Sequence, residues 1–333
     1  MQWKTIFFFL FLVVKGLSAQ NNIVGVIGFY NVENLFDTEN DQNINDEDFL
    51  PDGVNKWNEK RYGEKLANMS RVIGDMGTGP DIMGLSEVEN RRVIEDLVQT
   101  PKLKPKKYQI IHFDSPDGRG IDVALIYKVN KFKPITAFTV PVRDENSNDF
   151  RTRDILWVKG LFAGDTLHIA VNHWPSRRGG KEDKRILAAT VLRNTVDSVL
   201  AVNSKANIIT MGDFNDDPIN RSIKKVLDAN MNLNKLKENS LYNCGGSIFK
   251  QGYGSLYYRG AWNLFDQIMV SKNLLASVNS PYHFRVKDFY VFVQPYMQVK
   301  DGEFKGGPFR TFSRGVYQGG FSDHFPVLIY LTR

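Results

Sequence analysis

Short apolar segments recur along the whole chain and are bounded by turn-forming residues, which is the pattern of β-strands. We expect strands over residues 23–30, 82–85, 108–112, 123–127, 155–162, 167–171, 206–211, 265–270 and 325–330. Strand-to-strand connections without an intervening helix are frequent. The pattern therefore favours sheets packed together with helices outside, rather than a simple doubly wound sheet.

Longer segments between the strands have the periodicity of helices, and they cover residues 59–76, 90–99, 182–202 and 219–229. In the third segment an apolar stripe recurs at helical spacing and contains Ala189, Leu192, Val196, Val199 and Leu200. Arg185 and Arg193 lie outside this stripe. Composition shows no internal repeat and no boundary after residue 20, so we expect one domain over residues 20–333.

The first nineteen residues predict an export signal that is cleaved from the mature protein. Lys4 supplies the positive charge, residues 6–14 an apolar run, and residues 17–19 a small-residue cleavage site before Gln20. The alternative, an uncleaved membrane anchor, requires a longer apolar run. We therefore expect a signal peptide over residues 1–19 and a protein that resides in the periplasm or outside the cell, without membrane insertion.

Charge and cysteine content narrow the possible functions only a little. The chain carries 43 basic and 37 acidic residues, a net charge of +6, which falls to +4 when Lys4 and Lys15 leave with the signal. This excess permits a polyanionic substrate but is weaker than that of a strongly basic nucleic-acid binder. Cys244 is the single cysteine, so an exported protein must fold without an internal disulfide. A small buried residue is its simplest interpretation.

The segment 37–52 carries seven acids and no base. Asp41, Asn43 and Asn45 alternate like the oxygen ligands of a calcium loop, but Asp46 lies where such a loop needs glycine. We favour a solvated loop, with a calcium site as the alternative.

Two segments combine the polar side chains that metal-assisted hydrolysis of a phosphate ester needs. Gly-Asp-Phe-Asn-Asp at 212–216 follows an apolar run, and Ser-Asp-His at 322–324 precedes one. Asp213, Asn215, Asp323 and His324 therefore lie at strand ends, where a rigid scaffold aims polar groups into a cleft. Carboxylates hold a hard cation, one acid activates water, and the amide and imidazole bind phosphate oxygens.

More polar residues stand at what we expect to be the C-terminal ends of strands. They are Asn31, Glu33, Glu87, Arg119, Asp122, Asn172, His173, Arg177, Arg178 and Asp266. Most have a simple structural explanation when taken singly, such as a turn asparagine at 31, a helix N-terminal acid at 87 or loop charges at 177 and 178. Asp266 resists such an explanation because a charge inside an apolar strand needs a partner. Together the residues indicate one active site.

The order Asn31, Glu87, His173, Asp213-x-Asn215, Asp266 and Ser322-Asp323-His324 resembles the endonuclease/exonuclease/phosphatase superfamily, which has the DNase I-like fold. The segments Phe-Tyr-Asn-Val-Glu-Asn-Leu-Phe-Asp, Arg-Gly-Ile-Asp-Val-Ala-Leu-Ile-Tyr and Asn-His-Trp-Pro-Ser-Arg-Arg-Gly-Gly are similar to its exported bacterial branch. The resemblance implies an α/β (α+β) fold, a four-layer sandwich of two mixed β-sheets packed face to face with helices outside. It also implies a Mg²⁺ or Mn²⁺ phosphodiesterase cleft at one edge, with Ca²⁺ as a further candidate ion.

The resemblance also implies roles for single residues. Glu87, Asn31 and Asp323 resemble the metal-binding residues, with Glu33 as an acidic neighbour. Asp213 resembles the acid that orients or deprotonates the attacking water or assists the leaving group, and Asn215 a donor to phosphate. His324, held by Asp266, is similar to the imidazole that contacts the scissile phosphate, and His173 to a second catalytic imidazole, a candidate general acid. A His–Asp pair fixes the tautomer and raises imidazole basicity, which suits these roles.

Residues that match only the bacterial branch are candidates for the substrate groove. They are Arg119, Asp122, Arg151, Arg153, Arg177 and Arg178. The arginines would pair with flanking phosphates, or they are solvated strand-end charges. An aromatic-rich segment with Tyr253, Tyr257, Tyr258 and Trp262 would stack bases or pack against the sheet.

The leading hypothesis is an exported, monomeric, metal-dependent phosphodiesterase, a nuclease whose substrate is DNA or RNA. The alternative is a phosphatase or phospholipase C-type hydrolase of inositol phosphate or sphingolipid head groups, since the same chemistry serves both. A non-catalytic binding module is a third class, but it would have no need of the complete set of acids and imidazoles.

Overall fold

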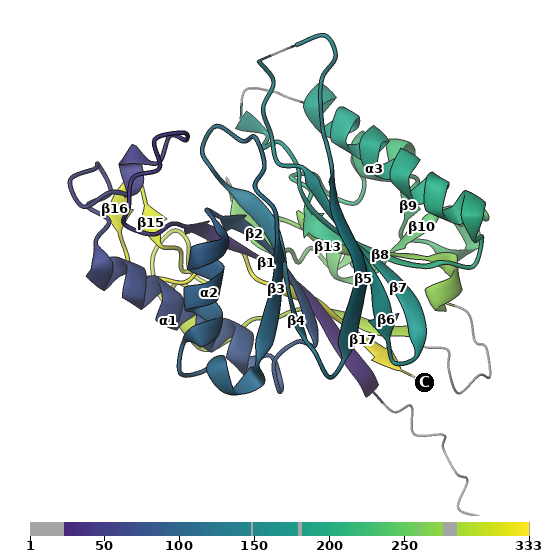
Figure 1. Cartoon of the computed structure of the whole chain (residues 1–333), viewed down its shortest axis with the longest axis horizontal. Helices are drawn as coiled ribbons and strands as arrows, with labels where there is room; N and C mark the ends of the chain where they lie inside the picture. Colours follow the sequence, from purple (N-terminus) through teal and green to yellow (C-terminus); the bar gives the residue numbers. More distant parts are fainter. Residues whose placement is uncertain (1–22, 148, 179–181, 259, 276–284, 333) are drawn as a thin grey trace, which may run out of the picture.

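Two β-sheets lie face to face in the centre of the protein, and helices cover their outer faces (Figure 1). The computed structural model describes residues 23–147, 149–178, 182–258, 260–275 and 285–332. The expected signal peptide at 1–19 lies outside the described residues and stays a prediction. The four-layer sandwich expected from the sequence is confirmed.

The first sheet has the strand order β14-β17-β1-β2-β4-β3. Its strands are β1 (Ile23–Leu35), β2 (Ile82–Val88), β3 (Tyr108–His112), β4 (Asp122–Lys128), β14 (Arg285–Val291) and β17 (Val327–Thr332). β1 and β2 are parallel, whereas the other neighbours are antiparallel.

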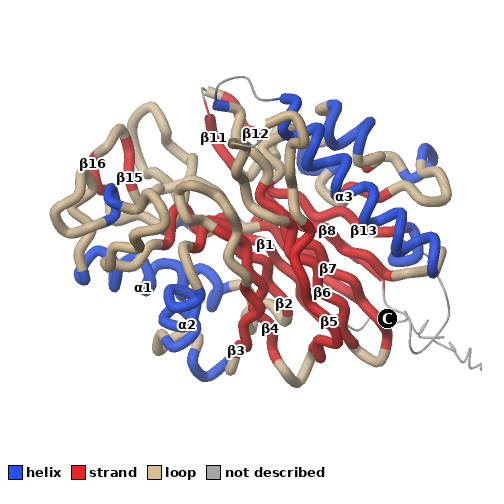
Figure 2. Tube along the Cα trace, turned by 45° about the horizontal axis from the view of Figure 1, so that its top comes forward, coloured by secondary structure: helices blue, strands red, loops and turns tan. Residues whose placement is uncertain are grey.

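The second sheet has the order β5-β6-β7-β8-β13-β10-β9. Its strands are β5 (Phe132–Val140), β6 (Ile155–Phe162), β7 (Asp165–His173), β8 (Asn207–Asp213), β9 (Ala229–Asn230), β10 (Leu241–Asn243) and β13 (Asp266–Ser271). The pairs β7–β8 and β9–β10 are parallel, so this sheet is also mixed. Two hairpins, β11 (Leu256–Tyr258) with β12 (Ala261–Asn263) and β15 (Phe312–Ser313) with β16 (Val316–Tyr317), lie with long loops at the end of the sandwich away from the C-terminus (Figure 2).

The helices belong to the two outer layers and to the connections. They are α1 (Glu59–Asp75), α2 (Arg91–Gln99), α3 (Glu182–Val202) and the short α4 (Gly246–Lys250), with 3₁₀ turns η1 (Glu47–Phe49), η2 (Lys104–Lys106), η5 (Leu233–Lys235), η6 (Lys272–Leu275) and η7 (Pro295–Met297) and a π-helical turn η4 (Ser222–Val226). Asn58 and Asn90 begin α1 and α2 with side-chain caps that accept from the backbone N–H groups of Arg61 and Val93.

Three apolar clusters hold the layers together. Phe29 and Leu125 of the first sheet meet Ile169, Met211 and Ile268 of the second in the space between the sheets. Two outer clusters then join the helices to the sheets, one with Met69, Ile94 and Met83 and the other with Leu192, Val196 and Trp157. Each fully buried Leu, Ile or Met side chain stabilises the fold by about 1.5–3 kcal/mol. No helix in the described ranges is long and apolar enough to cross a membrane.

All nine expected strands are present, but two long strands were not expected. β5 and β14 lie at sheet edges, and their sequences carry charged residues, together with Pro134 in β5. Edge strands tolerate charge and proline because one side of their backbone faces solvent, so their apolar pattern is weak.

The helix expected over 219–229 is wrong, and Arg185, which we placed outside the apolar stripe, is buried. The chain there forms only the turn η4, after which Asp228 has a φ of +53° and β9 begins. Arg185 is buried, with its Nε 2.8 Å from Asp216 Oδ2. A guanidinium enters the interior when a carboxylate is there to meet it, and helical periodicity alone does not reveal such a partner.

His168 in β7 provides a test of the packing around Trp157. Trp157 Nε1 donates to His168 Nδ1 over 3.4 Å, and burial, followed by the charge of Lys159, lowers the pKa of His168 to about 4. The imidazole is thus neutral in the folded protein at a pH where it is charged in the unfolded chain. Its contribution to stability is complete above about pH 6.5 and is lost as the pH falls toward 4.

We expect His168→Gln, which keeps an acceptor for Trp157 but cannot gain charge, to lose less stability in acid. Between pH 8 and pH 4.5 its free energy of unfolding should fall by about 1 kcal/mol less than that of the wild type, after allowance for partial solvent exposure. Denaturant unfolding at both pH values measures the difference. Parallel losses in the two proteins would show that His168 does not titrate in this way.

Candidate active site

Polar side chains from both sheets meet at one edge of the sandwich. Asn31 and Glu87 lie near the C-terminal ends of the parallel strands β1 and β2, and His173 and Asp213 end the parallel strands β7 and β8, where they are register neighbours. Asp266 pairs with Asp213 across the antiparallel ladder. Asp266 therefore begins β13, and the expectation that it follows a strand is wrong. Asp122 likewise begins β4, and Asp323 and His324 precede β17.

Asn31 bridges the two sheets through its side-chain amide. Its Nδ2 donates to Glu87 Oε1 over 3.2 Å and to Asp213 Oδ2 over 3.1 Å, and its Oδ1 accepts from the backbone N–H of Glu33. Asn31 is fully buried. The amide therefore fixes the separation of one carboxylate from each sheet.

Glu87 points into the site because β2 is irregular at this position. The register of β2 with β4 shifts between Ser86 and Val88, and Glu87 has a φ of +62°. A bulge of this kind re-aims one side chain out of the regular alternation. The backbone N–H of Asn34, itself at positive φ, donates to Glu87 Oε2 over 3.0 Å and holds the carboxylate.

His324 is paired with the buried carboxylate of Asp266. Its Nδ1 lies 2.6 Å from Asp266 Oδ2, and Ser255 Oγ donates to the same oxygen. Its Nε2 faces Asp213 Oδ2 and Asp323 Oδ1, each at 3.8 Å. Burial by itself would lower the pKa of His324, but the charges of Asp266, Asp323 and Asp213 raise it well above its usual value. His324 is therefore an imidazolium at neutral pH.

The surroundings of His173 shift its pKa in the opposite direction. Burial, together with the charges of Arg153, Arg119 and His324, lowers the pKa of His173 well below its usual value, so this imidazole is neutral. Its Nε2 lies 3.7 Å from both Glu87 Oε1 and Asp213 Oδ2. Among the described residues, no group forms a hydrogen bond with its buried Nδ1. The role of general acid that the resemblance implied for His173 suits a neutral ring poorly.

Asp213 lies at the centre of these contacts. It is buried, and burial followed by the charge of Asp266 raises its pKa to about 7, against the opposing effect of His324. A carboxylate with a pKa near neutrality can accept a proton from water and release it again.

Asn215 sits at positive φ (+50°) on the turn after β8. Its backbone N–H donates to Asp213 Oδ1 and its Nδ2 to the backbone carbonyl of Trp174, each over 2.9 Å. The side chain thus has a structural partner besides its expected role toward phosphate. Gly212 is required for close strand packing, since a Cβ there would lie 2.3 Å from the carbonyl oxygen of Asn172.

Several residues expected in the substrate groove have other partners in the structure. Arg153 is buried, pairs with Asp117 at 2.7 Å, and donates to the backbone carbonyls of His173 and Trp174. Asp122 is also buried and accepts from the backbone N–H of Ser115, with His112 Nε2 2.9 Å away. Both side chains therefore hold the protein together.

The remaining arginines of that group differ in their exposure. Arg177 contacts Asp216 and Asp217 at 3.2 Å and lies 4.4 Å above the ring of Phe265. Arg119 is 54% exposed, and Arg151 and Arg178 are also exposed. These three side chains are open to solvent.

Sequence reasoning missed Lys65, which is buried in α1 behind the site. Its Nζ donates to Thr311 Oγ1 and to the carbonyl of Phe321, each over 2.6 Å, while the Thr311 N–H donates to Glu33 Oε2. Burial lowers the pKa of Lys65 to about 8 and, with the charge of Asp323, raises that of Glu33 to about 7. The sequence did contain a sign of this burial, because Lys65 lies at helical spacing between the apolar residues Tyr62, Met69 and Val72.

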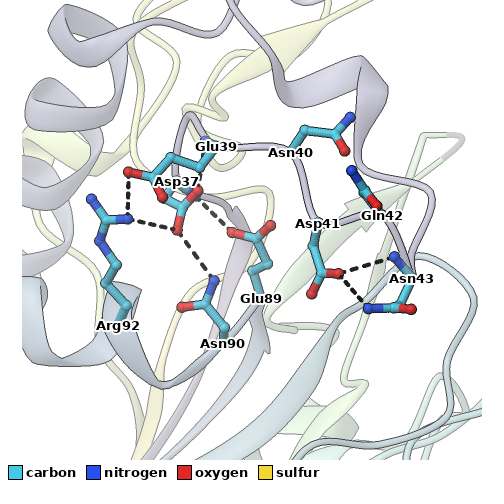
Figure 3. A pocket seen from close by; sticks show the side chains of 9 residues that line it. All are labelled: Asp37, Glu39, Asn40, Asp41, Gln42, Asn43, Glu89, Asn90 and Arg92. Atoms are coloured by element: carbon cyan, nitrogen blue, oxygen red, sulfur yellow. Dashed lines mark hydrogen bonds and ion pairs between the residues drawn. The ribbon is translucent and has the colours of Figure 1, made fainter.

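The acidic segment 37–52 forms part of a separate cavity of about 450 Å³ (Figure 3). Arg92 pairs with Glu39 at 2.7 Å, and Asn90 Nδ2 donates to Asp37 Oδ2. Within the described ranges, the groups of three or more metal-ligating side chains that converge are Asp213 with Asp266 and His324, and His112 with Asp114 and Asp122. Neither belongs to this segment.

The donor set of the site fits a hard divalent cation. Glu87 and Asp213 are linked through Asn31, and Asp323 lies across from them beside His324. Carboxylate and amide oxygens are the ligands of Mg²⁺, Mn²⁺ and Ca²⁺. In the convergent group of Asp213, Asp266 and His324, the short hydrogen bond already occupies His324 Nδ1 and Asp266 Oδ2. Glu87, Asn31 and Asp323 stay the metal-binding candidates that the resemblance implied.

Comparisons with known proteins agree with this geometry. The sequence profile of the Endonuclease/Exonuclease/phosphatase family matches residues 26–333. No curated protein sequence matches the chain.

Solved structures share the fold at low sequence identity. The mannosyl-6-phosphatase of Bacteroides thetaiotaomicron is 18% identical with a TM-score of 0.58, over 92% of this chain and 99% of that one. The D. rerio TDP2 in complex with a single-strand DNA product is 13% identical with a TM-score of 0.57, over 92% and 98% of the two chains. A humanized D. rerio TDP2 gives the same values. At such identities the likeness shows the fold alone.

We expect Arg153→Met to destabilise the protein by about 3–5 kcal/mol, because it leaves Asp117 buried without its cation. Arg119→Met removes a cation from the same carboxylate at 3.5 Å, but Arg119 is largely exposed and its loss should cost less than about 1 kcal/mol. Urea unfolding of both variants measures the difference. Equal effects would mean that Arg153 is not the residue that holds the loop of Asp117 to the His173 strand.

Proposed function

Because the chain belongs to the endonuclease/exonuclease/phosphatase family, we propose that it is an exported, divalent-metal-dependent phosphodiesterase that cleaves nucleic acid. Membership of the family supports phosphoester hydrolysis in general. The observation that carries the proposal is the position of His324, whose Nδ1 is held by Asp266 and whose Nε2 faces Asp213 and Asp323. A fixed positive charge beside a carboxylate of near-neutral pKa is what hydrolysis of a phosphate ester requires.

Different residues supply the positive charge and accept the proton in this reaction. The Nε2–H group of His324 donates a hydrogen bond to a non-bridging phosphoryl oxygen. Asp266 binds Nδ1, and Nε2 therefore faces the substrate. Asp213 takes a proton from the attacking water as the water oxygen bonds to phosphorus. The bond from phosphorus to the leaving oxygen breaks in the same step, and the leaving oxygen takes up a proton from solvent. Neutral His173 places its Nε2 3.7 Å from both Glu87 Oε1 and Asp213 Oδ2, where an N–H can donate to a substrate oxygen.

Glu87, Asn31 and Asp323 would hold the metal ion. When bound, Mg²⁺ or Mn²⁺ supplies positive charge for the phosphoryl and leaving oxygens. Asn31 would then have to exchange one of its present hydrogen bonds for a ligand role. Its position between Glu87 and Asp213 already places the amide beside both.

A diester of nucleic acid is the substrate we favour, and a sugar or inositol phosphate is the second candidate. The fold neighbours support both, since one is a phosphatase and another is in complex with single-strand DNA product. Exposed Arg119, whose charge acts on His173, favours a substrate with further phosphates. Export rests on residues 1–19 alone, and the N-terminal sequence of the mature protein would test it.

We expect activity to require a divalent cation and to fall by about 10²–10⁴-fold in Asp213→Asn and in His324→Gln. Both changes preserve shape while removing the base or the positive charge. Asp197→Asn, on the exposed face of α3, is the matched control and should keep full activity. Undiminished turnover in either folded site variant would overturn the assigned roles.

We expect single-stranded DNA or plasmid DNA to be cleaved in Mg²⁺ or Mn²⁺, and cleavage to stop with EDTA. The comparison substrates are inositol phosphates, mannose 6-phosphate and sphingomyelin, assayed through phosphate or phosphocholine release. Turnover of these compounds without cleavage of DNA or RNA would replace the nuclease with the second candidate.

A further inference from the structure

An aromatic cavity of about 490 Å³ lies beside the catalytic residues and has no part in the chemistry described so far. Tyr257 and Tyr258 of β11 form one wall, and Phe304, Phe309 and Pro308 another. Arg310, Ser313, Gln318 and Glu303 supply polar groups at its edge. Its size and mixture of apolar walls with few polar groups are those of a small-molecule site.

The cavity is joined to the active site through two backbone segments. Leu256, next to Tyr257, forms a β-bridge with His324, and Ser255 binds the Asp266 carboxylate. Arg310 Nη2 lies 3.2 Å from Asp323 Oδ2. A short linker would therefore connect a chemical group bound in this cavity to a phosphate bound at His324.

The walls are held in place without a ligand. Trp262 supports Tyr257 at 5.2 Å between ring centroids and stacks on Phe325 at 5.9 Å. On the other side, backbone bonds from Val299 N to the Gly307 carbonyl and from Gly306 N to the Val299 carbonyl, each 2.9 Å, close the loop that carries Phe304. Rigid walls of this kind reduce the entropy cost of binding.

We propose that this cavity is a nucleobase subsite, so that the enzyme recognises a nucleotide next to the scissile phosphate through its base. The inference rests on the proposed function. Aromatic side chains stack on any base, and the polar edge near Arg310 can hydrogen-bond to base edges. The alternative aromatic-cage ligand, a choline head group, would meet Arg310 here. The charge of Arg310 disfavours a quaternary ammonium.

The first experiment compares cleavage of the dinucleotide TpT with two analogues, each lacking one of the two bases. For wild-type enzyme, removal of one particular base should lower kcat/KM by about 10–100-fold, mainly through KM. Phe304→Ala should remove this difference, because the ring is 37% exposed and its loss spares the core. Phe138→Ala, which removes an exposed aromatic on edge strand β5 (46% exposed), should retain it. Equal cleavage of all three substrates by the wild type would overturn the subsite.

The second experiment measures binding without turnover. Calorimetry with thymidine 5′-monophosphate, deoxyribose 5-phosphate and phosphocholine should show binding about tenfold tighter when the base is present, and this advantage should be lost in Phe304→Ala. Base-dependent binding without cleavage of any diester would keep the subsite and refute the proposed nuclease. Equal binding of the two sugar phosphates, or tighter binding of phosphocholine, would overturn the subsite itself.

Discussion

Burial of the Asp213 carboxyl group is the constraint on which this edge of the protein depends. A carboxylate without access to water is costly unless hydrogen bonds and opposite charge compensate for it, and the partners of Asp213 come from several strands. Asn31 reaches it from the first sheet, the Asn215 N–H from its own turn, and His324 from the segment before β17. The face-to-face packing of the sheets is therefore also what assembles the site.

Two imidazoles near Asp213 are driven to opposite protonation states by their surroundings. His324 has three carboxylates around it, whereas His173 faces the nearby cations Arg153, Arg119 and His324. Because their surroundings shift the pKa values of the two imidazoles in opposite directions, His324 can carry positive charge while His173 acts as a neutral donor. The ion pair of Arg153 with Asp117 contributes twice, because it fixes the His173 backbone and adds positive potential there.

Much of the fold could be predicted from apolar spacing, since buried strands of both sheets carry continuous hydrophobic runs. Edge strands β5 and β14 could not, because Pro134 and charged residues hide their pattern. In the site, the order of acids and imidazoles was informative, but the aim of Glu87 depends on a bulge that no spacing indicates. The partners of Arg153, Asp122 and Arg177 were also hidden, because an ion pair between distant segments exists only once the chain has folded.

The position of the metal ion tests the account most directly, and the measurement is Mn²⁺ binding followed by electron paramagnetic resonance in Glu87→Gln and Asp266→Asn. The account predicts that Glu87→Gln weakens Mn²⁺ binding about tenfold or more, whereas Asp266→Asn changes it by less than about twofold while activity is lost. Loss of Mn²⁺ binding in Asp266→Asn with normal binding in Glu87→Gln would contradict it, and would place the ion among Asp213, Asp266 and His324 instead.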